Sequence, residues 1–197
     1  MSRGKGYKRG DHWTRKAQAS GYAARSVFKL SEIDQRCKLL KRGQRAVDLG
    51  CYPGSWSRYL RERLGPDGVL VGVDLDEPKG IPGIFLTESV YDVNATQLLS
   101  SLGGPCDVLV SDMAPPTSGD RFGDHARQIR LVWRALELAE ATLRPGGAFV
   151  AKVFEGEDAP EVAQAVRARF ARFRRIKPKA TRGRSVELFV IGQEYKA

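Results

Sequence analysis

Three acidic residues, Asp48, Asp74 and Asp112, each stand at the end of a short apolar run. The runs predict buried strands, and the carboxyl ends of parallel strands meet at one edge of a sheet. We therefore expect the three carboxylates to lie close together at that edge. Such a group suits a ligand with ribose hydroxyls and a cationic end, and S-adenosylmethionine carries both a sulfonium and an ammonium group. The alternative role of each acid is helix capping or solubility.

A glycine-containing turn follows the first of these acids, within the segment Val47-Asp-Leu-Gly-Cys-Tyr-Pro-Gly-Ser-Trp56. Gly50 and Gly54 let the backbone turn tightly and approach a ligand. Ser55 is the predicted N-cap of a helix that runs to about Leu64. This strand, turn and helix start places backbone N–H groups and a carboxylate where open α/β sheets bind nucleotide-like ligands.

The spacing of the turn and the second acid narrows the ligand. Asp74 lies 20 positions after Gly54, the distance at which dinucleotide-binding folds place an acid on the ribose hydroxyls. The dinucleotide pattern also needs a middle glycine, which is missing here, and Pro53 removes a backbone donor. The turn is therefore poorly suited to a pyrophosphate. Two alternatives stay open, a nicotinamide-dependent oxidoreductase on the same sheet and glycines that serve the turn alone.

Hydrophobic periodicity predicts the elements that position these residues. Helices are expected near residues 22–39, 55–64, 95–102, 123–143 and 159–170, and strands near 46–49, 68–74, 84–86, 107–112, 147–153, 174–177 and 186–191. Alternating strands and helices imply an α/β, Rossmann-like fold with a mainly parallel, doubly wound sheet. The last two strands lack an intervening helix and predict an antiparallel edge hairpin. Residues 1–20 predict a basic, mobile arm, and residues 21–197 a single domain.

The net charge of +10 is concentrated in two blocks. Residues 1–45 hold 13 Lys and Arg against three acids, and residues 167–184 hold nine against none. Residues 46–166 between them have a net charge of −8. Two basic flanks around an acidic middle indicate a polyanion held across a catalytic core. A basic surface that serves only solubility is the alternative.

The remaining composition limits the class of protein. A hydrophobic content of 42% is ordinary for a globular chain of 197 residues, and no apolar run approaches the roughly 18 residues that span a bilayer. The basic start lacks the apolar segment of a secretory signal, so we expect a cytoplasmic location. Cys37, Cys51 and Cys106 are widely spaced, and only His12 and His125 could help them hold a metal. We therefore expect buried thiols, without a metal site or disulfides.

Several short segments, taken in their order and spacing, resemble one protein family. They are Arg25-Ser-Val-Phe-Lys29-Leu, Asp48-Leu-Gly50 with Pro53-Gly54 and Trp56, Ser111-Asp112-Met-Ala-Pro115, Val150-Ala-Lys152-Val-Phe154 and Arg184-Ser-Val-Glu187. From about residue 13 onwards the chain is similar to the FtsJ/RrmJ (RlmE) ribosomal RNA 2′-O-ribose methyltransferases. The resemblance implies a Rossmann-like methyltransferase fold with S-adenosylmethionine as methyl donor. It further implies methylation of a ribose 2′-hydroxyl, that of a uridine, in 23S ribosomal RNA of the large subunit.

The resemblance also implies a catalytic tetrad, matching Lys29, Asp112, Lys152 and Glu187. Lys152 is the hypothesised base for the 2′-hydroxyl, or orients it, and Asp112 would align Lys152 and the methionine end of the cofactor. Lys29 and Glu187 would hold the hydroxyl. From the residues alone, Lys29 at the edge of a helical apolar stripe would reach solvent. Glu187 alternates onto the face that carries Phe189, an unusual place for an unpaired acid.

Cofactor contacts are likewise implied by the resemblance, at Gly54, Trp56, Asp74 and Asp112. The sequence departs from the family at two positions. Ser55 stands where a second glycine is common, and Ser89 stands where an acid near the adenine is common. Asp92 is therefore an alternative adenine contact.

The basic segments are the expected contacts for RNA. The arm at residues 1–20, with Tyr7 and Trp13 for stacking, and the run Arg167 to Arg184 would bind phosphates and bases. We expect a monomer with no obligate protein partner and no membrane association. Two alternatives stay open, a 2′-O-methyltransferase that acts on transfer RNA or another RNA, and a non-catalytic RNA-binding factor in ribosome assembly.

Overall fold

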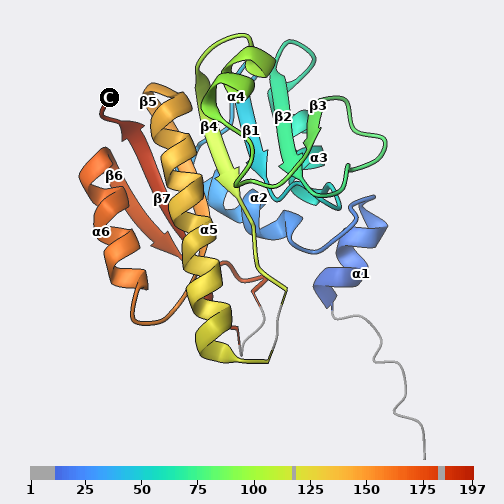
Figure 1. The fold of residues 1–197 in the computed structure, drawn as a ribbon. Helices are drawn as coiled ribbons and strands as arrows, with labels where there is room; N and C mark the ends of the chain where they lie inside the picture. The colour runs from blue at the N-terminus through green and yellow to red at the C-terminus, as the bar shows by residue number, and fades with distance from the viewer. Residues whose placement is uncertain (1–11, 117–118, 182–184) are drawn as a thin grey trace, which may run out of the picture.

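A computed structural model describes residues 12–116, 119–181 and 185–197 (Figure 1). The helices are α1 (His12–Ala19), α2 (Val27–Cys37), α3 (Ser55–Leu64), α4 (Ala95–Leu102), α5 (Arg121–Thr142) and α6 (Ala159–Arg169). The strands are β1 (Arg45–Leu49), β2 (Val69–Asp74), β3 (Ile84–Thr87), β4 (Cys106–Ser111), β5 (Leu143–Phe154), β6 (Phe170–Ile176) and β7 (Glu187–Tyr195).

The strands form one seven-stranded sheet in the order β3-β2-β1-β4-β5-β7-β6. The pairs from β3 to β5 are parallel, and β7 is antiparallel to both β5 and β6. This confirms the predicted α/β fold with an antiparallel hairpin at one edge. Because β7 is antiparallel to both of its neighbours, β6 runs in the same direction as β5, and the two strands end on the same side of the molecule.

Each face of the sheet carries its own hydrophobic core. Helices α4, α5 and α6 cover one face, where Val47 and Leu109 point, and α2 and α3 cover the other, where Ala46 and Val110 point (Figure 1). Neighbouring residues of a strand alternate between the two cores, as the pleat requires. Burial on both faces explains why the parallel strands are continuous apolar runs in the sequence.

The N-terminal region differs from the prediction. The expected helix at residues 22–39 is shorter, since α2 spans only Val27–Cys37, and His12–Ala19 of the predicted arm forms α1. Trp13 packs against Phe28 of α2 with ring centroids 5.2 Å apart, and the Lys16 ammonium lies over both rings. Trp13 thus fastens α1 to α2. The prediction of a mobile arm at residues 1–11, including Tyr7, lies outside the described residues.

Other local predictions are corrected or confirmed by the backbone. Ser55 is the first residue of α3, and Gly54, with φ of 103°, is its N-cap. Ser55 Oγ instead accepts a hydrogen bond from Ala24 N at 2.6 Å. All three cysteines are free and buried, as expected. Within the described part of the chain, no helix is long and apolar enough to cross a membrane.

Candidate active site

Lys152 and Asp112 meet where β4 and β5 end. Lys152 Nζ lies 3.1 Å from Asp112 Oδ1 and donates to the Asp112 carbonyl oxygen at 2.6 Å. Lys152 is buried, with 7% of its surface exposed. A buried ammonium requires such partners, because desolvation without them is costly. The bond to the Asp112 carbonyl uses one donor of the ammonium, and Asp112 Oδ1 is an ion-pair contact without a hydrogen bond, so donors remain for a further group.

Lys29 and Glu187 form a second buried pair. Lys29 Nζ lies 2.5 Å from Glu187 Oε1, and the two side chains are 9% and 14% exposed. Lys29 therefore does not reach solvent as the apolar stripe alone suggested, and Glu187 gains the partner that its position on an apolar face required. The pair joins α2 to the first residue of β7, two segments that are far apart in the sequence.

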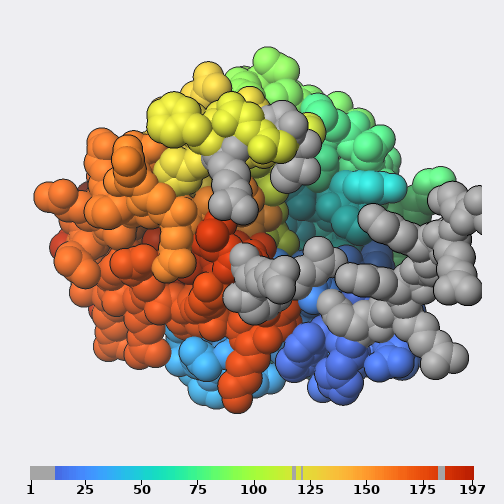
Figure 2. Space-filling model, turned by 90° about the horizontal axis from the view of Figure 1, so that it is seen from below, coloured from blue at the N-terminus to red at the C-terminus, as the bar shows by residue number. Residues whose placement is uncertain are grey.

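The two pairs are neighbours because Lys152 and Glu187 lie on the same face of the sheet, the face that α2 covers. Lys152 follows Val150 by two residues, and Glu187 precedes Phe189 by two, and both apolar side chains belong to the core under α2 and α3. Phe189 is the register partner of Lys152, and Lys29 Nζ lies 5.9 Å from the centroid of its ring. The sheet thus brings together the whole predicted tetrad at the carboxyl end of its parallel strands. Figure 2, seen from below, looks onto that end, where α5 (yellow), the C-terminal segments (orange to red) and the N-terminal helices (blue) meet.

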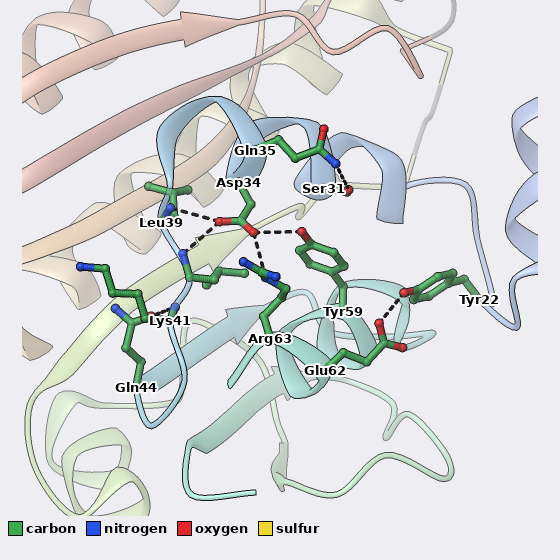
Figure 3. A network of polar contacts seen from close by, with 11 residues as sticks. Tyr22, Ser31, Asp34, Gln35, Leu39, Lys41, Gln44, Tyr59, Glu62 and Arg63 are labelled. Atoms are coloured by element: carbon green, nitrogen blue, oxygen red, sulfur yellow. Dashed lines mark hydrogen bonds and ion pairs between the residues drawn. The ribbon is translucent and has the colours of Figure 1, made fainter. Parts of the chain in front are cut away.

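Asp34 fixes the helix that carries Lys29. One of its oxygens accepts from Leu39 N and Leu40 N at 3.1 and 3.0 Å, and the other accepts from Tyr59 of α3 at 2.9 Å and pairs with Arg63 (Figure 3). Asp34 is 3% exposed, so a loss of these partners would strand a buried carboxylate. The network ties the end of α2 to α3 and so sets the position of α2 against the sheet.

A cavity of about 720 Å³ opens beside Asp112, lined by residues from the ends of β1, β2 and β4 and from α5. Asp74 lies in its wall, where its Oδ2 accepts from Tyr52 N at 2.8 Å and its Oδ1 from Leu75 N at 2.7 Å. Each carboxylate oxygen keeps a lone pair for a ligand hydroxyl. Gly50 is required here, because a Cβ would come within 2.7 Å of Met113 Cγ and its φ is +80°.

Asp48 is fully buried beneath the cavity wall. Its Oδ2 accepts from the Ser57 hydroxyl at 2.6 Å, and no described residue donates to its Oδ1. Burial, with smaller contributions from Asp112 and Asp74, raises the pKa of Asp48 to about 7. Asp48 therefore does not line the cavity with the other two acids.

The predicted cofactor residues separate into two groups in space. Asp74 and Asp112 line the cavity, whereas Gly54 and Trp56 are absent from its described lining. The Trp56 indole is buried, donates to Ser26 O at 2.9 Å and packs on Phe189. A cofactor contact by Gly54 or Trp56 stays a prediction, and it would have to come from the backbone at the start of α3.

The far end of the cavity holds one of the two proposed adenine contacts. Ser89 lines the cavity together with Glu88, and Asp92 does not. Sequence reasoning missed Arg134 of α5, which donates to Val90 O at 3.1 Å and Val93 O at 2.7 Å and so holds this loop. It also missed Gln128 of α5, whose side chain donates to Lys152 O near the end of β5. Neither residue carries a local signal, because their role depends on where α5 packs.

The size and donor set of the cavity fit an adenosine cofactor. Its volume lies in the range of small-molecule sites, with a ribose-binding acid at a strand end and a second acid beside it. A Rossmann-like sheet with an antiparallel β7, an acid-lined cavity and an adjacent lysine–acid site defines an S-adenosylmethionine-dependent methyltransferase. The sequence profile of the FtsJ-like methyltransferases matches residues 22–195, and the chain belongs to that family.

Curated relatives and solved structures agree with this assignment. The chain is 47% identical over 192 residues to the ribosomal RNA large subunit methyltransferase E of Sorangium cellulosum, covering 97% of this chain and 91% of that protein. It is 46% identical to the enzyme of the same name from Syntrophobacter fumaroxidans, covering 94% and 96% of the two chains. A ribosomal RNA methyltransferase from Plasmodium falciparum shares the fold, with a TM-score of 0.77 at 24% identity, over 88% of this chain and 98% of that one.

Proposed function

We propose that this protein transfers the methyl group of S-adenosylmethionine to the ribose 2′-hydroxyl of a uridine in 23S ribosomal RNA of the large subunit. The observation that carries the proposal is the pairing of Lys152 with Asp112 and of Lys29 with Glu187 beside the cavity. The printed names of the relatives, which are large-subunit ribosomal RNA methyltransferases, support the substrate class. We further propose that the protein acts as a monomer. A ribosomal substrate supports a cytoplasmic location.

The cavity suggests how the cofactor lies. Asp74 would bind the ribose hydroxyls, and Ser89 and Glu88 would face the adenine end. The methionine end would then lie toward Gly50 and Asp112. This order directs the methyl group toward Lys152, because Lys152 Nζ contacts Asp112 on the neighbouring strand.

The reaction forms a bond from the 2′-oxygen to the methyl carbon, breaks the bond from that carbon to sulfur, and releases the hydroxyl proton. A remaining donor of the Lys152 ammonium would bind the 2′-oxygen and hold it in line with the methyl group. Lys29 and Glu187 would hold the hydroxyl from the other side, with the Glu187 carboxylate as an acceptor for its hydrogen. With the Lys152 ammonium orienting the oxygen, the hydroxyl proton leaves to water late in the displacement.

The described basic residues of the run at 167–184, which the sequence predicts to bind RNA, fall into two groups at opposite ends of β6. Arg167 lies over the Phe173 ring, Arg169 pairs with Glu140, and Arg172 pairs with Glu194. These residues belong to α6 and the first part of β6, away from the site, where charges protect an edge strand. Lys177 and Lys179 are exposed at the other end of β6, beside Ile176, the register partner of Phe189, and Lys177 has only a long contact of 4.0 Å with Glu155. We propose that these two lysines contact RNA phosphates. Residues 182–184 lie outside the described part.

A charge-reversal comparison tests this division. We expect Lys177→Glu with Lys179→Glu to weaken RNA binding several-fold and to lower the slope of log K against log salt by roughly 1.4, at about 0.7 per contact for single-stranded RNA. Arg167→Glu with Arg172→Glu makes the same charge change at the far end of the strand and is the matched control. Equal losses for the two double variants would contradict the division.

The proposed function is tested by labelled methyl transfer. S-adenosylmethionine with a labelled methyl group is incubated with naked 23S ribosomal RNA and with isolated large subunits, and the product is mapped by resistance to alkaline hydrolysis. A labelled, alkali-resistant linkage that disappears when the target carries a 2′-deoxyribose is the expected result. Label on a base, or RNA binding without any transfer, would overturn the proposal, and the second outcome would favour an assembly factor.

A further inference from the structure

Gln128 of α5 makes two hydrogen bonds to the strand that carries Lys152. Its side chain is fully buried, with 0% exposed. Its Nε2 donates to Lys152 O at 2.6 Å, and its Oε1 accepts from Phe154 N at 3.0 Å. Both contacts are made with the backbone, on the two sides of Val153. A single carboxamide therefore satisfies two successive inward peptide groups at the end of β5.

This pattern is that of a neighbouring parallel strand. In a parallel ladder, one residue donates to the carbonyl before its partner and accepts from the N–H after it. Gln128 does both across Val153, with a side chain in place of a backbone. The ladder between β4 and β5 ends at the pair Ser111 and Ala151, so no β4 residue occupies this rung. Without Gln128, a buried carbonyl and a buried N–H would lose their partners.

Because the Gln128 side chain takes the place of a β4 residue beside Val153, β4 can leave the sheet directly after Ser111. The Asp112 carbonyl accepts from Lys152 Nζ, whereas in a continued β4 it would point toward β1, because Ser111 is the residue whose backbone faces β5. Met113 packs against Gly50, and the chain from Asp112 to Pro116 forms one wall of the cavity. On its other side, Lys152 is held by the register with Phe189 of β7. The end of β5 is thus fixed from both sides.

We infer that Gln128 is a positioning residue for methyl transfer, which replaces a strand at the end of β5 and so fixes Lys152 against Asp112. The inference rests on the proposed function for its kinetic consequence. Its structural part is independent of that function. Gln128 touches neither the proposed cofactor nor the reacting atoms.

Two variants and one control separate positioning from general stability. Gln128→Met keeps the approximate length but can neither donate nor accept as an amide does. Gln128→Glu keeps an acceptor for Phe154 N and places a carboxylate against Lys152 O. Thr142→Val is the control, because the Thr142 hydroxyl is buried at the far end of the same helix and donates to Leu138 O at 2.6 Å. The control removes one buried hydrogen bond from α5 and leaves the site intact.

Two readouts are needed. Hydrogen exchange should show faster exchange of the Phe154 amide in Gln128→Met, retained protection in Gln128→Glu, which keeps an acceptor for that amide, and no change there in Thr142→Val. Single-turnover methyl transfer at saturating cofactor and RNA should fall by roughly tenfold or more in Gln128→Met, because a small displacement at a reacting centre costs rate. Cofactor affinity by calorimetry should stay within about twofold of the unaltered protein, since Gln128 lies outside the cavity lining.

The outcomes distinguish the inference from the proposed function. An unaltered protein that transfers no methyl group refutes the proposed function, and the exchange of the Phe154 amide still decides whether Gln128 braces the strand. An active unaltered protein with a Gln128→Met rate within twofold overturns the inference alone. A Gln128→Met variant that loses rate and cofactor affinity in equal measure would also overturn it, since the residue would then support the cavity.

Discussion

The cofactor half of the sheet, β3, β2, β1 and β4, presents Asp74 to the cavity without a charged partner among the described residues, whereas the reaction half, β5, β7 and β6 with α2, presents Lys29 and Lys152 paired with acids. Asp74 is held by two backbone N–H groups and faces an open cavity. Lys29 and Glu187 are buried against each other. An acid that faces an open cavity stays solvated until a ligand with hydroxyls and positive charge binds. A buried lysine–acid pair differs, because each charge needs its counterion before any substrate arrives.

The largest expected effect lies in the reaction half, at Lys152. Lys152→Ala should lower the single-turnover rate of methyl transfer by about 10²-fold to 10⁴-fold, the range for a positioned acid or base. Cofactor affinity should change little, since Asp74 and the cavity wall remain. Stopped-time assays with labelled cofactor measure the first quantity and calorimetry the second. Normal affinity together with near-normal transfer would remove Lys152 from the mechanism.

The pair of Lys29 and Glu187 tests whether charges here must be matched. Lys29→Met should cost about 3 kcal/mol of unfolding free energy, because it leaves the Glu187 carboxylate buried without its partner. Lys29→Met with Glu187→Leu should recover most of that loss while methyl transfer stays absent. Urea unfolding of the two single variants and the double variant gives the coupling. Additive losses of stability would show that the two side chains do not depend on each other.

In the cofactor half, Asp74 should affect binding and leave the fold intact. Asp74→Asn keeps an acceptor but loses the charge that strengthens hydrogen bonds to ribose hydroxyls, so cofactor affinity should fall roughly tenfold to a hundredfold. Calorimetry measures the affinity, and the thermal midpoint should move by only a few degrees. A drop in midpoint as large as that of Lys29→Met would erase the contrast between the halves.

The last expected effect is a change in the pH dependence of stability at Asp48. With its pKa raised to about 7 against about 3.9 in an unfolded chain, Asp48 binds a proton more tightly when folded. Its contribution to stability is full below pH 4 and is lost as pH rises through 7. Asp48→Asn removes this loss while keeping an acceptor for Ser57. We expect the variant to gain on the order of 2 to 4 kcal/mol over the unaltered protein at pH 8, and little at pH 4.

Thermal unfolding followed across this pH range checks the prediction. The informative quantity is the difference in unfolding free energy between the two proteins at each pH, because the titration of their shared groups cancels in that difference. A difference that is the same at pH 4 and pH 8 would mean that the Asp48 carboxyl is not the titrating group.

The two halves also differ in how far the sequence reveals them. The cofactor half could be predicted from short segments, because an apolar run that ends in an acid places Asp74 and Asp112 at the same edge of a parallel sheet. Position in a strand is a local property. The alternation around Glu187 likewise gave its face correctly. Within the turn, Ser55 was assigned as the N-cap, whereas Gly54 caps α3, since the choice between adjacent small residues depends on a backbone angle.

The reaction half depends on contacts between distant segments, and these leave no local pattern. The apolar stripe of α2 placed Lys29 at its edge, but burial follows from β7, which comes about 160 residues later and brings Glu187. From the sequence alone, Gln128 and Arg134 are typical of the polar face of an amphipathic helix. Their roles follow only from the packing of α5 against β5 and the loop after β3. The family resemblance named the tetrad, yet it gave no account of what holds Lys152 in place.

β7 comes last among the strands in chain order but lies between β5 and β6. Until its residues are added during synthesis, β5 has an open edge and β6 has no place in the sheet. The parallel strands of the cofactor half can pair earlier, since they are complete by the end of β5. The described lining of the cavity ends at Leu131, before β5 begins, whereas the Lys29 pair needs Glu187 of β7, so the two sites differ in how much of the chain must be in place before each is complete.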